Sequence, residues 1–122
     1  MIRIIIIGIL FFFVSCNSEL MQIDAPENLI PKEKMVEVMK ELVKLESHIQ
    51  SRYPSVSEYN KTMLNSSDVL FKKMHVTRLE FESSMDYYGT HQKEMKEIYA
   101  EVLDQLNSEL GEIQSIKQDS IK

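Results

Sequence analysis

The sequence predicts an all-α fold, a small antiparallel bundle of three to four helices. Apolar residues between positions 31 and 113 recur at steps of three and four, which is the period of a helix with one buried face. Prolines and capping motifs divide this stretch into segments with short connections. The only β-rich run lies in residues 4–14. Helices joined by short connections pack side by side in opposite directions.

The first helix is predicted to begin at Pro31 and to end before Pro54. Proline suits the first helical position and restrains the residue before it. The apolar face of this helix consists of Met35, Met39, Leu42, Leu45 or Glu46, and Ile49.

The second helix is predicted to begin at a capping box formed by Ser55 and Glu58. Its apolar face carries Tyr59, Met63, Leu70 and Met74. The polar run 65–68 leaves open whether the helix is continuous, because Asp68 can cap a second, shorter piece.

The third helix is predicted to start at the capping box of Thr77 and Glu80 and to end at Gly89, which can adopt the left-handed conformation. Phe81, Ser84, Met85 and Tyr88 share one of its faces. Thr90 can cap the fourth helix, whose apolar stripe consists of Met95, Ile98, Tyr99, Val102, Leu106, Leu110 and Ile113.

The N-terminal segment predicts a membrane anchor at Cys16. Arg3, an apolar run and Ser15 precede this cysteine in the order of a secretory signal, and residues 13–16 resemble a bacterial lipoprotein lipobox. The run is about half the length that a membrane-spanning helix needs. We therefore expect a cleaved signal peptide (1–15), a lipidated cysteine with its tether (16–28), a helical domain (29–113) and a flexible tail (114–122). An uncleaved short anchor and a free mature protein are the alternatives.

The residues after Cys16 and the net charge of the chain bear on where the protein lies and on what it can bind. Asn17, where an aspartate would favour the inner membrane, predicts the outer membrane. The absence of an acidic run after it favours the periplasmic leaflet of the cell envelope. A formal net charge of −5 makes the chain a poor ligand for nucleic acid. A single cysteine excludes an intramolecular disulfide.

Several short segments follow one another in a characteristic order and spacing: Leu29–Val36, Leu70–Lys73, Val76–Thr77, Phe81, Ser84, Tyr87–Tyr88, Glu97–Tyr99, Val102 and Leu106. Together they resemble a family of small Bacteroidota lipoproteins classed as a domain of unknown function (domain of unknown function 4296 type). The resemblance supplies no catalytic residue. Met74-His75 stands where the family more usually has His-Gly, and Gly89–Gln92 where it often has Asn-Pro, so the geometry of both turns is open.

Three tyrosine and serine residues are candidates for a partner-binding patch. Ser84 and Tyr88 lie one helical turn apart, and Tyr87 adds a second rigid aromatic ring. The alternative is structural, with Ser84 allowing two helices to approach and a tyrosine ring packing with its hydroxyl at the edge. Leu110 and Ile113 are further candidates, because their stripe continues beyond what a small bundle needs to bury.

Catalytic and metal-binding patterns are weak. His48, His75 and His91 are dispersed, and only His91 and Glu94 share a spacing that suits metal ligands. The carboxylate pairs Glu82/Asp86 and Glu33/Glu37 suit a solvated helix face in an acidic protein. Ser83 and Ser84 lack the glycines of a nucleophile elbow. We therefore expect no enzyme activity, metal or cofactor.

The sequence thus favours a non-enzymatic, lipid-anchored interaction module that docks on a larger envelope assembly. The alternative is a carrier or sensor of a small apolar ligand such as a lipid, because flexible methionines can line an adaptable pocket. At their helical spacings these methionines also suit an ordinary core; they are Met35, Met39, Met63, Met74, Met85 and Met95. Asp119-Ser120-Ile121 resembles a Bacteroidota O-glycosylation motif in the predicted tail.

Overall fold

The structure is a computed structural model and describes residues 22–53 and 55–120. Four helices make up most of this part of the chain. They are α2 (Lys32–Arg52), α3 (Val56–Lys73), α4 (Arg78–Thr90) and α5 (Gln92–Asp119). Strands do not occur within these residues. The prediction of an all-α helical bundle is confirmed. Residues 1–21, with the predicted signal peptide and Cys16, lie outside the described residues, as does Ile121 of the glycosylation motif.

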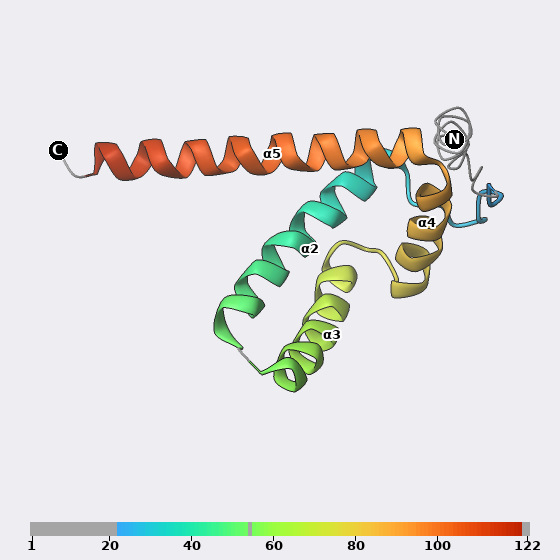
Figure 1. Ribbon diagram of the computed structural model, residues 1–122, viewed down its shortest axis with the longest axis horizontal. Helices are drawn as coiled ribbons and strands as arrows, with labels where there is room; N and C mark the ends of the chain where they lie inside the picture. Colours follow the sequence, from blue (N-terminus) through green and yellow to red (C-terminus); the bar gives the residue numbers. More distant parts are fainter. Residues whose placement is uncertain (1–21, 54, 121–122) are drawn as a thin grey trace, which may run out of the picture.

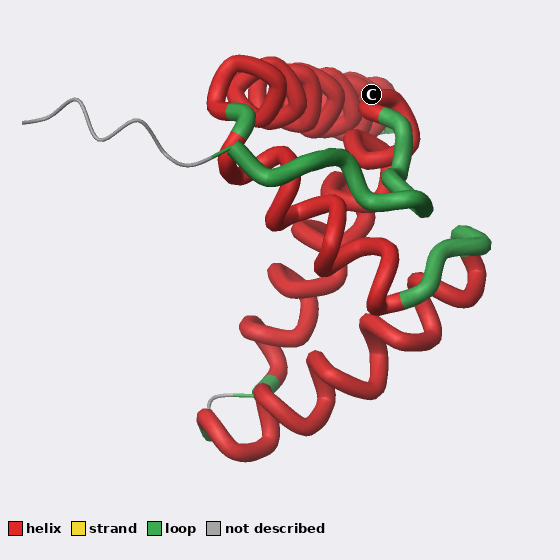
Figure 2. Tube along the Cα trace, turned by 90° about the vertical axis from the view of Figure 1, so that its right-hand side faces the viewer, coloured by secondary structure: helices red, strands yellow, loops and turns green. Residues whose placement is uncertain are grey.

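The helices are arranged around α2. It forms an antiparallel pair with α3, and α5 packs across its N-terminal half (Figure 1). The short helix α4 follows α3 and leads directly into α5, against which it packs. Viewed along α5, the other three helices all lie on one side of it (Figure 2). One side of α5 is therefore covered by the bundle, while its C-terminal part projects beyond α2 (Figure 1).

Two of the predicted helix starts are confirmed, the first to within one residue, because Pro31 is the N-cap residue and the helix begins at Lys32. Pro31 directly precedes α2, and its carbonyl oxygen accepts a hydrogen bond from the Met35 N–H at 2.8 Å. At the start of α4, the Glu80 N–H donates to Thr77 Oγ1 at 3.2 Å, and the Thr77 N–H donates to Glu80 Oε2 at 2.7 Å. The Thr77 N–H and the Thr77 hydroxyl both donate to the Glu80 carboxylate, and these two hydrogen bonds hold its pKa below the ordinary value.

The prediction for the start of α3 is wrong in its detail. Ser55 precedes the helix but its side chain makes no capping hydrogen bond. The polar run 65–68 does not interrupt α3, which is continuous. Ser67 is buried there and donates to the Leu64 carbonyl at 3.0 Å, so its hydroxyl is satisfied within the helix. Asp68 pairs with Arg78 of α4 at 2.7 Å and caps no second piece.

The junction of α4 and α5 also differs from the prediction. Gly89 lies inside α4 and does not adopt a positive φ. Thr90 is the last residue of α4, and its hydroxyl donates back to the Tyr87 carbonyl at 2.9 Å, so it does not cap α5. His91 alone separates the two helices. At its other end α5 continues to Asp119, so residues 114–119, expected as a flexible tail, are helical.

His75 takes the left-handed conformation in the turn between α3 and α4, with φ of 57°. The Val76 N–H donates to the Phe71 carbonyl at 3.0 Å, and the His75 N–H donates to the Lys72 carbonyl at 3.2 Å. This pair of hydrogen bonds is the Schellman arrangement, whose left-handed position is usually glycine. The turn therefore keeps the geometry that a glycine would favour, with a histidine in it.

The core lies where α2, α4 and α5 meet, with Phe71 contributed by α3. Its buried residues are Ile30, Met35, Val36, Val38, Met39, Phe71, Val76, Tyr88, Ile98 and Val102. Met74, Met85 and Met95 are half-buried and pack against this cluster. Five of the six methionines of the helical domain thus take part in the core or its border. Their role in the structure is packing, which is the simpler of the two interpretations given above.

Candidate functional site

Ser84 and Tyr88 of α4 bind both backbone groups of one residue, Ile30. The Ile30 N–H donates to Ser84 Oγ at 2.9 Å, and the Tyr88 hydroxyl donates to the Ile30 carbonyl oxygen at 2.8 Å. Ser84 is 0 % exposed and Tyr88 is 2 % exposed. Burial raises the pKa of the Tyr88 hydroxyl above its ordinary value, so it remains a hydrogen-bond donor. We call this arrangement of Ser84, Tyr88 and Ile30 the Ile30 clamp.

The clamp joins the segment that leads to the predicted anchor to the body of the bundle. Ile30 lies immediately before Pro31 and α2, where a buried backbone needs partners that the helix itself cannot supply. Further along the same segment, the Ile23 N–H donates to Thr90 Oγ1 at 3.2 Å. This placement fits the structural interpretation of Ser84 and Tyr88 as packed residues, although the Tyr88 hydroxyl is buried against the Ile30 carbonyl and does not lie at the edge. Neither side chain lies at the surface, so the prediction that they form part of a partner-binding patch does not fit the structure.

Tyr87 is half-buried and is engaged by its neighbours. Its ring stacks on that of His91 with the centroids 4.0 Å apart, and meets the Tyr88 ring edge-on at 5.2 Å. His91 Nδ1 lies 2.8 Å from the Tyr87 carbonyl oxygen. Tyr87 therefore stiffens the α4–α5 junction, and only part of its ring remains for a partner.

The remaining candidates, Leu110 and Ile113, are exposed on α5, at 56 % and 54 %. The last residue of α5 that the body holds is Glu109, whose carboxylate lies 2.8 Å from Lys40 Nζ and 3.1 Å from Lys44 Nζ of α2. Hydrogen bonds from Lys40 and Lys44 keep the pKa of Glu109 below its ordinary value. Beyond it every described residue of α5 is exposed. We call residues 110–119 the α5 arm.

The arm presents an apolar edge with no cover from the rest of the described chain. Besides Leu110 and Ile113, Ile116 is 65 % exposed there. Nearer the body, Tyr99 and Leu103 are 48 % and 60 % exposed on the same helix. Large apolar side chains gathered on one edge are typical of an interaction surface. Sequence reasoning found the stripe but did not separate its buried residues, Ile98 and Val102, from its exposed ones.

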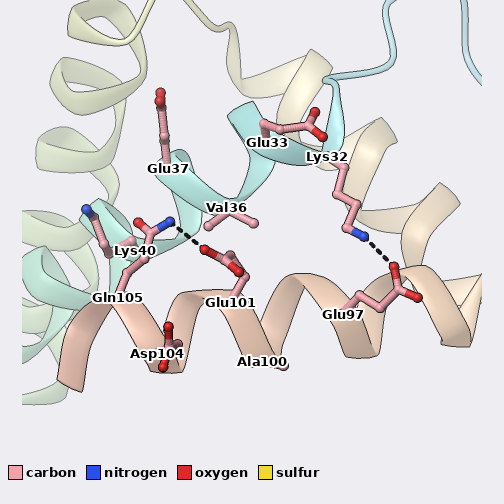
Figure 3. A pocket seen from close by; sticks show the side chains of 10 residues that line it. All are labelled: Lys32, Glu33, Val36, Glu37, Lys40, Glu97, Ala100, Glu101, Asp104 and Gln105. Carbon is pink, nitrogen blue, oxygen red and sulfur yellow. Dashed lines mark hydrogen bonds and ion pairs between the residues drawn. The ribbon is translucent and has the colours of Figure 1, made fainter. Parts of the chain in front are cut away.

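A groove of about 850 Å³ runs between α2 and α5 (Figure 3). It lies on a different side of α5 from the exposed residues Tyr99, Leu103 and Leu110. Five carboxylates and two lysines line it: Glu33, Glu37, Glu97, Glu101, Asp104, Lys32 and Lys40. Lys32 pairs with Glu97, and Gln105 donates to Glu101 at 3.0 Å (Figure 3). The groove is a charged, solvated surface, as expected for the pair Glu33/Glu37, and is unsuited to an apolar ligand.

Metal-binding geometry is not found in the described residues, where no group of three or more histidine, cysteine, aspartate or glutamate side chains converges. Helices long and apolar enough to cross a membrane are likewise not found among them.

The residue that sequence reasoning missed is Arg78. It donates to the Leu64 carbonyl at 3.1 Å and to Ser67 Oγ at 2.8 Å, and thereby ties α4 to α3. Only its first-turn position in α4 was visible in the sequence.

Fold and site together define a small all-α protein with a clamped N-terminal segment and one long, partly uncovered helix. The family model described as a domain of unknown function (DUF4296) matches residues 26–112. The chain belongs to this family, which confirms the resemblance found in the sequence. The match includes the Ile30 clamp and ends within the arm. Searches of curated proteins and of solved structures gave no match.

Proposed function

We propose that this protein is a lipid-anchored, non-enzymatic interaction module of the cell envelope, an accessory subunit that docks on a larger assembly through α5. Acyl groups on Cys16 would hold it in the periplasm-facing leaflet of the outer membrane. The observation that carries the proposal is the α5 arm, which exposes Leu110, Ile113 and Ile116 beyond the last contact with the body.

The energetics of the arm favour a partner. A helix end without tertiary contacts gains little stability from its own hydrogen bonds, because isolated short helices are marginal in water. Fully burying a leucine or isoleucine contributes about 1.5–3 kcal/mol, so covering the half-exposed Leu110, Ile113 and Ile116 would contribute about 3 kcal/mol in total. A partner groove would supply that burial, and the bundle does not.

The position of the arm relative to the predicted anchor also supports docking. The described part of the N-terminal segment meets the bundle through Ile23 at Thr90, the last residue before the α4–α5 junction. α5 has 28 residues and is therefore about 42 Å long. The arm thus lies at the other end of α5 from Thr90, away from the point where the N-terminal segment meets the bundle, which would leave it accessible to a partner.

The test is in-cell lysine crosslinking of the full chain in its native cells, followed by isolation and identification of attached proteins. We expect one envelope protein, dependent on Cys16 and lost in a Leu110→Asp, Ile113→Asp variant. Leu79→Asp is the matched control, because Leu79 is 75 % exposed on α4, away from the arm. Equal recovery from the arm variant and the control would contradict the proposal, as would recovery that does not depend on Cys16.

A further inference from the structure

The exposed apolar residues of α5 follow the spacing of a coiled-coil seam. Tyr99, Leu103, Leu106, Leu110 and Ile113 are separated by steps of four, three, four and three residues. All of them except the half-buried Leu106 are 48–60 % exposed. We call these five residues the α5 seam. Ile98, Val102 and Glu109 contact the body along a different line of the same helix.

The charges around the seam suit contact with an identical surface. One flank carries Ala100, Asn107 and Gln114, all uncharged, in a chain whose net charge is −5. On the other flank Glu109 is paired with two lysines of its own chain. The acidic residues of α5 that line the groove lie roughly on the opposite side of the helix at 100° per residue. Two copies can therefore bring their seams together, because the carboxylate of Glu109 is compensated by lysines of its own chain and the other flank is uncharged.

We propose that α5 pairs antiparallel with α5 of a second copy of this chain along the seam. This inference rests on the proposed function, since it takes α5 as the interaction element and names its first occupant. An isologous contact of this kind satisfies two-fold symmetry, the commonest symmetry of oligomers. In the pair, Leu103 lies opposite the partner's Ile113, and Leu106 lies opposite the partner's Leu110. Tyr99 then lies opposite the partner's Lys117, whose ammonium can approach the ring face.

The shape of the monomer selects the antiparallel direction. The bundle lies along the N-terminal part of α5 and the arm projects from the other end (Figure 1). Antiparallel pairing places the body of each copy beside the arm of the other, so the two bodies lie at opposite ends. Parallel pairing would bring both bodies to the same end and leave both arms together.

The size of the contact predicts a weak pair that the membrane strengthens. From Tyr99 to Lys117 the helix is about 28 Å long and about 10 Å wide, so the contact is small beside the 1,200 Å² or so of a standard stable interface. Anchoring both copies in one leaflet raises their effective concentration. With the two-fold axis along the membrane normal, both N-terminal segments face the same leaflet.

The experiment is oxidative crosslinking of the full chain in its native cells. Leu103→Cys combined with Ile113→Cys places two cysteines opposite each other in the antiparallel pair, within reach of a disulfide. The matched controls are the two single variants and Leu79→Cys on α4. In a single variant the cysteine of one copy lies about 15 Å along the helix from the same cysteine of the other copy, too far for a disulfide. We expect the double variant to run at twice its mass without reductant, and the three controls to remain at the single mass.

Each other outcome is decisive. Self-crosslinking of Leu103→Cys alone would show a parallel pair and overturn the proposed arrangement. A crosslink of the double variant to a different protein would overturn self-pairing while supporting docking on a larger assembly. The absence of any adduct would overturn self-pairing. If lysine crosslinking recovers only the second copy, the self-pairing stands and docking on a larger assembly fails.

Discussion

Replacing Ser84 with alanine removes one half of the Ile30 clamp. The Ile30 N–H would lose its acceptor at 2.9 Å, in a place where Ser84 is 0 % exposed and Ile30 is 5 % exposed. Leaving a buried donor unpaired costs about 1–3 kcal/mol. Alanine recovers about 0.5 kcal/mol of helix propensity, so the expected net loss is about 1–2 kcal/mol. In a domain of about 100 residues this lowers the melting temperature by about 5–10 °C.

Ser83 provides a matched control on the same helix. Its hydroxyl donates to the Glu80 carbonyl of its own helix at 3.2 Å, so Ser83→Ala leaves no distant group unpaired. We would measure urea unfolding of a chain beginning at Gln22 by far-UV circular dichroism, and expect Ser83→Ala to be neutral or slightly stabilising. Equal stability of the Ser83 and Ser84 variants would refute the clamp as a stabilising contact.

Two changes at the turns follow from backbone geometry. His75→Gly should stabilise the protein by about 1 kcal/mol, because His75 has φ of 57° and a left-handed residue with a side chain costs about 1–2 kcal/mol. The control is His48→Gly in the exposed face of α2, which should destabilise the protein by about the same amount. A lower free energy of unfolding for His75→Gly would contradict the reasoning. Gly89→Ala should stabilise α4 by about 0.5–1 kcal/mol, because an added Cβ meets nothing within 4 Å and the residue is helical. Both are measured by urea unfolding, and destabilisation by Gly89→Ala would indicate that Gly89 ends the helix after all.

Local signals in the sequence predicted the helices but not all of their caps. Ser55 and Thr77 start the same motif, yet only Thr77 forms it. The physical difference lies in the residues around the motif. Val76 and Phe81 flank the Thr77 box and both belong to the core or its border, so packing fixes the entry of the chain into α4. Ser55 is exposed, and Tyr59, which corresponds in position to Phe81, does not belong to the core or its border.

The contacts that organise the site connect residues far apart in the sequence. Ile30 and Ser84 are separated by 54 positions and Ile30 and Tyr88 by 58. Helical periodicity placed Ser84 and Tyr88 on one face, but it carries no information about which backbone they meet. For the same reason it placed Tyr99, Leu110 and Ile113 in one stripe with Ile98 and Val102, although α2 covers only part of the width of that stripe.

The Ile30 clamp and the α5 arm are connected through α4, which contacts the N-terminal segment and leads directly into α5. Ser84 and Tyr88 hold the N-terminal segment at Ile30, and Thr90 holds it again at Ile23. α5 begins two residues after Thr90, and its N-cap residue His91 is held by the stack on Tyr87. The direction of α5 relative to the segment from Ile23 to Ile30 is therefore set by α4, through contacts that do not involve the α5 arm. A helix whose direction is fixed in this way loses less orientational freedom when it docks, and the proposed docking through α5 would draw on this advantage.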